Sequence, residues 1–204
     1  MVSQMDRRGF LRIAGASSVL AGLQAGPATV AQEAGKDVIE IKIDTLYRIG
    51  RWHFDPVGLH VRPGQKVRWV CLKWGGSATA FHPLHDNHEL RIPEGAKAFD
   101  SGILIDGGLR GSTFEWVFEQ EGTYDYYSRH HERLGAVGRI IVGTPGGPAE
   151  KPPGYGGSEG RAVMFGDSRK IFAWLTPERI LKEKSVPFPA EMMERTFPYL
   201  ESHF

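Results

Sequence analysis

The chain has 204 residues, with 25 lysines and arginines against 24 aspartates and glutamates, and a formal net charge of +1. Apolar residues make up 41% and charged residues 24%, a composition that excludes a disordered or fibrous chain. The even charge balance, without a block of basic residues, argues against a nucleic-acid-binding protein. A single cysteine excludes an intrachain disulfide, a Cys-x-x-Cys pair and all-cysteine metal sites, whereas there are eight histidines. This imbalance suggests metal chemistry without sulfur.

The first 31 residues have the features of an export signal. Arg7-Arg8 and Phe10-Leu11 precede a mildly apolar run, residues 13–23, that is rich in Ala, Gly and Ser. The pattern resembles a twin-arginine signal peptide, with cleavage expected after Ala31. At about a dozen residues the run is too short to cross a bilayer core of about 30 Å, which argues against a membrane anchor. We therefore expect a periplasmic or extracellular protein, exported already folded.

Apolar and polar residues alternate with a period of two between residues 38 and 143. The expected strands are residues 38–44, 66–71, 113–118, 123–127 and 139–142. Turn residues such as Pro63-Gly64 and Glu121-Gly122 separate them, and no long amphipathic helix lies between them. Short strands with this spacing predict an all-β antiparallel sandwich or barrel over 38–143.

Two segments follow this domain. Residues 144–160 are rich in glycine and proline and predict a linker. In residues 161–204, Thr176-Pro177-Glu178 predicts the start of a short helix that continues to about Lys184. This partly helical extension holds too many large apolar residues for a free tail, so we expect it to pack on the domain or on a second subunit.

Residues 122–142, GTYDYYSRHHERLGAVGRIIV, resemble the C-terminal motif of the small blue-copper proteins, the plastocyanin/azurin or cupredoxin family. The resemblance extends over nearly all of 38–143. Residues 79–83 and 91–96 also look like a periplasmic and archaeal subgroup of these domains. The resemblance implies a Greek-key β-sandwich.

The copper ligands of that family are mostly missing from this chain. The family takes a first His, then Cys, His and Met from the loop, because sulfur with two imidazoles suits copper in both oxidation states. Carried over residue by residue, the first-histidine position falls at about Gly76 or Ser77, the thiolate position at Ser128, the imidazole position at His131 and the axial position at Ala136. Cys71 lies on an earlier strand and is expected to be a small buried thiol. Blue-copper electron transfer therefore does not follow from the fold.

The remaining histidines suggest an altered metal site. Residues 81–89 are expected to begin near the same end of the domain as 128–136, so the two clusters could converge. Imidazoles with a carboxylate and no sulfur suit copper, zinc or iron. The candidate ligands, in order of preference, are His131, His82, His85, His88 and His130. The alternative is that these are solvated loop histidines on a domain without metal.

Three functions stay open. The first is an exported, cupredoxin-like metal-binding protein with a non-blue, His-ligated site, with copper as the expected metal and a role in electron transfer or copper handling. The second is a metal-free domain that serves as a structural or interaction module. The third is a mononuclear copper or iron redox enzyme. The expected partners are a metal ion, a redox or structural protein, or a second copy of the chain, with no nucleic acid and no membrane span in the mature chain.

Overall fold

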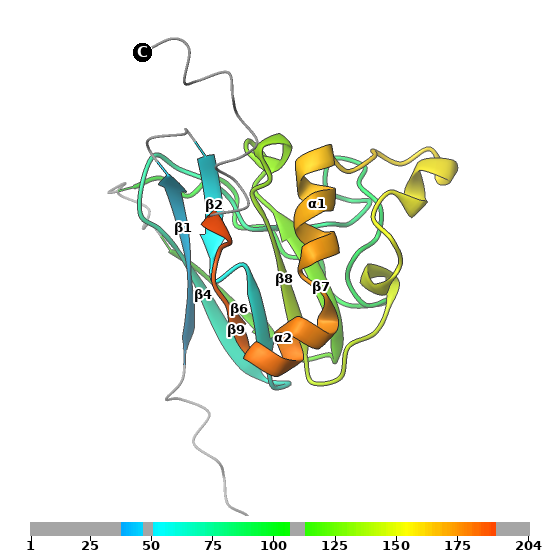
Figure 1. Cartoon of the computed structure of the whole chain (residues 1–204), viewed down its shortest axis with the longest axis horizontal. Coiled ribbons are helices and arrows are strands. Elements are labelled where there is room, and N and C mark those ends of the chain that lie inside the picture. Colours follow the sequence, from blue (N-terminus) through cyan, green and yellow to red (C-terminus); the bar gives the residue numbers. More distant parts are fainter. Residues whose placement is uncertain (1–37, 47–50, 107–112, 191–204) are drawn as a thin grey trace, which may run out of the picture. The chain divides into compact units, whose positions relative to one another are not determined.

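The computed structural model describes residues 38–46, 51–106 and 113–190 (Figure 1). The predicted signal peptide, residues 1–31, and residues 191–204 of the extension lie outside the described residues. The first sheet has the order β2-β1-β4-β6, made of β1 (Ile39–Leu46), β2 (Arg51–Asp55), β4 (Gln65–Cys71) and β6 (Thr113–Phe118). The second has the order β5-β7-β8-β3-β9, made of β3 (Gly58–Val61), β5 (Thr79–Ala80), β7 (Gly122–Tyr127), β8 (Val137–Val142) and β9 (Ser185–Val186).

The main core lies between the two sheets. Trp69 is fully buried at its centre and contacts aromatic rings from both sheets, among them Phe114 and Tyr126. The alternation predicted for β1 and β4 is confirmed, because Ile41 and Ile43 share this core with Val67, Trp69 and Cys71. Cys71 is buried, as expected, and burial raises the pKa of its thiol.

Each sheet contains one parallel pair of strands. β1 runs parallel to β4, and β3 runs parallel to β8. The expectation of a purely antiparallel sandwich is therefore wrong. After β2 the chain enters the second sheet as β3 and then returns as β4, so β4 joins β1 by a crossover and not by a hairpin.

A second apolar layer covers the other face of the β7–β8–β3 region. It is formed by α1 (Gly166–Trp174) and α2 (Pro177–Glu183), and Ile171, Phe172 and Leu175 pack there with Ile141 of β8. Thr176 caps α2, since its hydroxyl accepts a hydrogen bond from the Arg179 N–H. The prediction of an all-β sandwich with a short helical extension is confirmed. Within the described ranges, no helix is long and apolar enough to cross a membrane.

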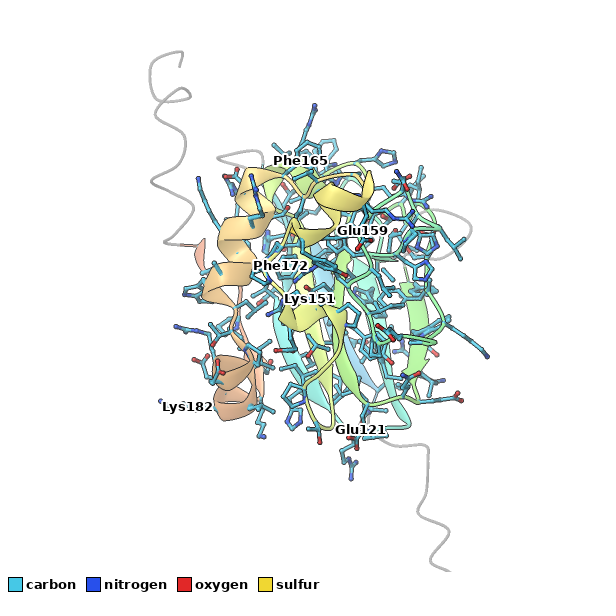
Figure 2. The ribbon with its side chains drawn as sticks, turned by 90° about the vertical axis from the view of Figure 1, so that its right-hand side faces the viewer. Glu121, Lys151, Glu159, Phe165, Phe172 and Lys182 are labelled. Atoms are coloured by element: carbon cyan, nitrogen blue, oxygen red, sulfur yellow. The ribbon has the colours of Figure 1, made fainter. Side chains whose placement is uncertain are left out.

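The glycine- and proline-rich segment lies against the sandwich (Figure 2). It forms two 3₁₀ turns, η3 (Pro148–Glu150) and η4 (Tyr155–Glu159). Two buried arginines hold it, because Arg91 donates to the carbonyl oxygens of Ala149 and Lys151 and Arg139 donates to that of Ala149. Although the segment has the composition of a linker, its backbone carbonyl oxygens accept the hydrogen bonds of these two buried guanidinium groups.

A carboxylate lies between the two arginines. Asp125 of β7 accepts hydrogen bonds from Arg91 Nε at 2.8 Å and from Arg139 Nε at 2.7 Å. Arg139 also donates to the Leu175 carbonyl oxygen, and its guanidinium lies 5.0 Å from the centre of the Phe172 ring. This buried cluster joins β7, β8, the 148–151 turn and the end of α1.

Candidate functional site

The positions that correspond to copper ligands do meet in the folded chain. A Cβ atom at residue 76 would lie 3.5 Å from Ser128 Oγ, so a side chain at this position would point toward Ser128. Ser128 N–H donates to the Ala136 carbonyl oxygen at 2.9 Å, and His131 N–H donates to the Ser128 carbonyl oxygen at 2.9 Å. We call Gly76, Ser77, Ser128, His131 and Ala136 the ligand pole.

Hydrogen bonds within the ligand pole join its polar groups to one another. Ser128 Oγ accepts from the Ser77 N–H at 3.1 Å and lies 3.2 Å from His131 Nδ1. Ser77 Oγ in turn accepts from the Arg129 N–H at 2.9 Å. Ser128 is fully buried, so its hydroxyl is not exposed to a substrate, and the pair lacks the accessibility that a nucleophilic serine needs.

The His131 ring is held as a neutral imidazole. It stacks on Trp52 of β2, with ring centres 4.2 Å apart and planes 1° from parallel. Burial, with the positive charges of His130 and Arg133, lowers the pKa of His131 to about 4. Because one ring nitrogen of a neutral imidazole is a donor and the other an acceptor, Nδ1 can form a hydrogen bond with the Ser128 hydroxyl in either tautomer.

The ligand pole does not fit a copper ion. Its side-chain donors are one imidazole and two hydroxyls, the His131 Nδ1 and the Ser128 hydroxyl already bond to each other, and the Ser77 hydroxyl bonds to the Arg129 N–H. Ala136 and Gly76 offer no side-chain donor, and the Cys71 thiol bonds instead toward the Lys73 carbonyl oxygen at 3.7 Å. Copper sites of this fold need thiolate and a second imidazole, which these residues do not supply.

The two histidine-bearing loops do approach each other, through a different pair of residues. His88 Nε2 lies 3.1 Å from Glu132 Oε2, and both side chains are buried. Phe81 and Tyr127 pack against the His88 ring at centre distances of 4.9 and 4.7 Å. His88 therefore bonds to a carboxylate on the 128–136 loop, but its ring packs between Phe81 and Tyr127 and not in the ligand pole.

His82 and His85 lie near each other in a turn, with ring centres 6.2 Å apart. The Leu84 N–H donates to His82 Nδ1 at 3.1 Å, so the neutral ring carries its proton on Nε2 and offers no lone pair there. His85 Nδ1 lies 3.2 Å from the Ala80 carbonyl oxygen, which requires the proton on Nδ1 and leaves the Nε2 lone pair available. Only His85 of this pair is prepared to bind a metal.

The five candidate histidines are thus spread over separate neighbourhoods. The exposed His130 has its ring centre 6.2 Å from that of His131. Across residues 38–46, 51–106 and 113–190, no group of three or more His, Cys, Asp or Glu side chains could hold a metal ion. The sequence did not indicate Trp52 as a partner of His131, because the buried residues of β2 do not alternate.

An exposed apolar surface lies beside the ligand pole. Gly76 pairs with Leu104 as an antiparallel bridge, and the segments that flank this bridge, residues 72–74 and 103–105, carry exposed apolar side chains. Trp74 is 68% exposed, Ile103 61% and Ile105 57%, and Leu72 is also exposed. Trp74 has a φ of 64°, a left-handed conformation that is uncommon for a bulky residue. We call Leu72, Trp74, Ile103 and Ile105 the apolar rim.

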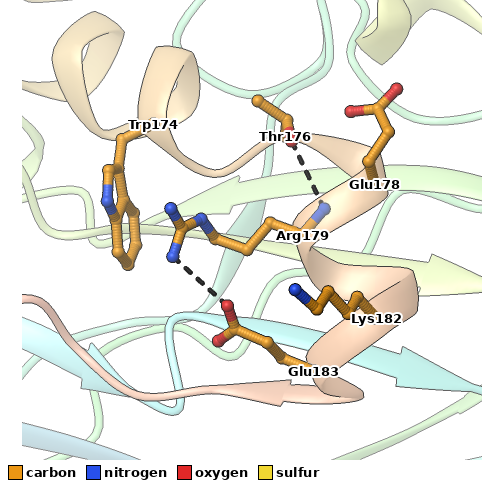
Figure 3. A pocket seen from close by; sticks show the side chains of 6 residues that line it. All are labelled: Trp174, Thr176, Glu178, Arg179, Lys182 and Glu183. Carbon is orange, nitrogen blue, oxygen red and sulfur yellow. Dashed lines mark hydrogen bonds and ion pairs between the residues drawn. The ribbon is translucent and has the colours of Figure 1, made fainter.

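A surface hollow lies elsewhere, beside α2 (Figure 3). Trp174, Thr176, Glu178, Arg179, Lys182 and Glu183 line it. The Arg179 guanidinium lies 4.5 Å from the centre of the Trp174 ring and forms an ion pair with Glu183 at 3.2 Å. Arg179 is therefore paired within the hollow, and none of the lining residues belongs to the ligand pole.

Comparisons with known proteins found similar sequences and similar structures. No family model matches the sequence. A halocyanin of Natronomonas pharaonis is 28% identical over 113 residues, which cover 55% of this chain and 61% of the halocyanin. The chain therefore spans about three fifths of that relative's length.

Among solved structures, pseudoazurin of Methylobacterium extorquens AM1 is 18% identical with a TM-score of 0.46, covering 69% of this chain and 100% of the pseudoazurin. A purple cupredoxin of Nitrosopumilus maritimus is 24% identical with a TM-score of 0.39, covering 52% and 99%.

Proposed function

We propose that this chain, whose sandwich is a cupredoxin-like domain, is an exported interaction module that binds a partner protein and holds no copper at its ligand pole. The observation that carries the proposal is the hydrogen bond between Ser128 Oγ and His131 Nδ1 at 3.2 Å. It joins the only imidazole of the ligand pole to the residue at the thiolate position. Electron transfer through a blue-copper centre therefore forms no part of the proposal.

The apolar rim supports the binding role. Trp74, Ile103 and Ile105 are each more than half exposed on segments next to one bridge, and exposed apolar surface typically marks interaction sites. Trp74 is held outward in a left-handed conformation, and strained residues of this kind concentrate at functional sites. An aromatic residue with aliphatic neighbours is also the usual composition of the centre of a protein interface.

Metal content tests the first half of the proposal. The purified full chain would be incubated with Cu(II), Zn(II) and Fe(II) in turn, dialysed, and analysed for bound metal. We expect no stoichiometric metal that depends on His131. Stoichiometric copper that disappears in His131→Ala, but not in the control His203→Ala, would contradict the proposal.

Site-specific photo-crosslinking in the exporting cell tests the second half. A crosslinking amino acid would replace Trp74, and the same group at Val117 would serve as the control. Val117 is also exposed, but it pairs with Lys66 at the far end of β4 from Cys71. We expect one discrete adduct from position 74 and none from position 117. Equal labelling at both positions would count against a specific partner.

The histidine turn supports a second candidate function, a weak metal site. His85 has its Nε2 lone pair available, and burial is the main cause that lowers the pKa of the neighbouring His82. Copper handling would then rest on His85, without the ligand pole. Metal that binds the full chain and is lost in His85→Ala, with His131→Ala unaffected, would favour this candidate.

We also propose that the chain reaches the periplasm or the extracellular space by the twin-arginine route. The Arg7-Arg8 pair and the apolar run after it support this. Replacing both arginines by lysine should retain the protein inside the cell with its first 31 residues uncleaved. Normal export of that variant would contradict the proposal.

A further inference from the structure

We infer that Ile43 fills the space that a ligand side chain at residue 76 would need, so that the ligand pole is closed to a metal by packing as well as by its missing donors. The inference rests on the proposed function, which it deepens, and concerns two residues that face each other across the end of the first sheet. A Cβ atom at residue 76 would lie 2.7 Å from Ile43 Cγ2. Real side chains do not approach this closely, so any residue larger than glycine must displace Ile43.

The requirement for glycine at residue 76 is one of space. Gly75 has a φ of 106°, which favours glycine for its conformation, but Gly76 does not have a positive φ. The same Cβ atom would point at Ser128 Oγ, 3.5 Å away. Residue 76 is therefore aimed correctly for a ligand, and the Ile43 methyl group lies in the way.

Neither backbone is free to move aside. Gly76 N–H donates to the Leu104 carbonyl oxygen at 2.9 Å, and Leu104 N–H donates back at 2.8 Å. Ile43 lies in β1 between β2 and β4, and its carbonyl oxygen accepts the Leu72 N–H at 2.9 Å. Its side chain is buried in the main core. Because both segments are held from two sides, relief must come from the Ile43 side chain itself.

A double-mutant cycle tests this contact without any metal. Gly76→Ala should lower the melting temperature by several degrees in the natural chain, and it should do so again in an Ile43→Val background, where Cγ2 remains. In an Ile43→Ala background, which removes Cγ2, the further loss should vanish. Gly146→Ala is the matched control, because nothing lies within 4 Å of a Cβ atom there. A loss of equal size in the Ile43→Ala background, or no loss in the natural chain, would overturn the inference.

Copper binding gives a second, independent measurement. The full chain carrying Gly76→His and Ser128→Cys would offer two imidazoles and a thiolate, and it would be compared with the same chain carrying Ile43→Ala in addition. We expect the visible thiolate–copper band, and copper affinity at least about tenfold tighter, only when Ile43 is shortened. Equal affinity with and without Ile43→Ala would overturn the inference, and so would folded variants that both fail to bind copper. Copper bound at the ligand pole of the natural chain would instead overturn the proposed function. The double-mutant cycle of Gly76→Ala and Ile43→Ala would then still test the role of Ile43.

Discussion

Asp125 of β7 and Ser128, which directly follows the strand, are both fully buried polar residues, and their surroundings differ. Asp125 lies between Arg91 and Arg139, accepts hydrogen bonds from both, and helps to hold the C-terminal extension. Ser128 lies at the ligand pole, where its partners are a backbone N–H and a neutral imidazole. One cluster is charged and joins four segments, whereas the other is neutral and joins two loops.

This difference separates the buried polar groups that the fold requires from those that it can do without. A buried carboxylate between two buried guanidinium groups cannot lose a member without leaving an uncompensated charge. A neutral serine–histidine pair can lose a member at the cost of a hydrogen bond. We therefore expect the charged cluster to control stability, and the ligand pole to accept substitutions that change its chemistry.

The largest effect is expected for Asp125→Ala. It leaves Arg91 and Arg139 buried without a carboxylate, which should reduce the free energy of unfolding by about 3–5 kcal/mol, a large share of a domain's typical stability of about 5–15 kcal/mol. Urea unfolding followed by tryptophan fluorescence measures this. Glu40→Ala is the control, since Glu40 is exposed and pairs with Arg68 at the surface. Similar losses in the two variants would contradict the comparison.

Ser128→Ala should have a smaller effect. It removes the acceptor of the buried Ser77 N–H and the hydrogen-bond partner of His131 Nδ1, which should cost about 1–3 kcal/mol. Ser128→Cys should retain more of that stability, because a thiol can occupy the same place as a weak donor and acceptor. Thr113→Ala, at an exposed position, is the control for both. If Ser128→Ala destabilised the protein as much as Asp125→Ala, the ligand pole would be as essential to the fold as the charged cluster.

The pH dependence of stability should show the neutral state of His131. Its folded pKa of about 4 lies below the ordinary value of about 6.5, so its contribution is fully present above pH 6.5. It is lost as the pH falls toward 4, because only the unfolded chain then takes up the proton. For a partly exposed ring the loss should be about 1 kcal/mol or less. The difference in unfolding free energy between the natural chain and His131→Asn, measured from pH 7.5 to 4, should follow this curve. A flat difference would contradict the neutral assignment.

The sequence was sufficient to predict the main core. Alternation in β1 and β4 placed Ile41, Ile43, Val67 and Trp69 on inner faces, because one face of each strand is buried and the other is not. β2 and β8 were harder to predict from the sequence. Residues on both faces of these strands are buried, so apolar and polar residues do not alternate with a period of two. The crossover that makes β1 and β4 parallel leaves no local pattern to detect.

The sequence could predict which residues form the ligand pole but not which side chains contact them. The resemblance placed Gly76, Ser128 and His131 together, and the structure brings these positions within contact distance. The stacking of His131 on Trp52 and the filling of the space at residue 76 by Ile43 depend on contacts between distant strands. Spacing along the chain contains no information about which apolar side chain occupies such a space.

The smallest effect is expected where the same arginine–carboxylate chemistry lies at the surface. Arg179 pairs with Glu183 one helical turn away and covers the Trp174 ring (Figure 3). Glu183→Gln should change the free energy of unfolding by about 0.5 kcal/mol or less, because solvent screens the pair and the ring contact remains. Raising the salt concentration should remove even that difference. Chemical denaturation at low and at high salt measures both, with Glu159→Gln as a control for an exposed carboxylate. Since Asp125 and Glu183 both pair with arginine, a loss for Glu183→Gln that approached the loss for Asp125→Ala would show that charge pairing itself, and not burial, sets the size of the effect.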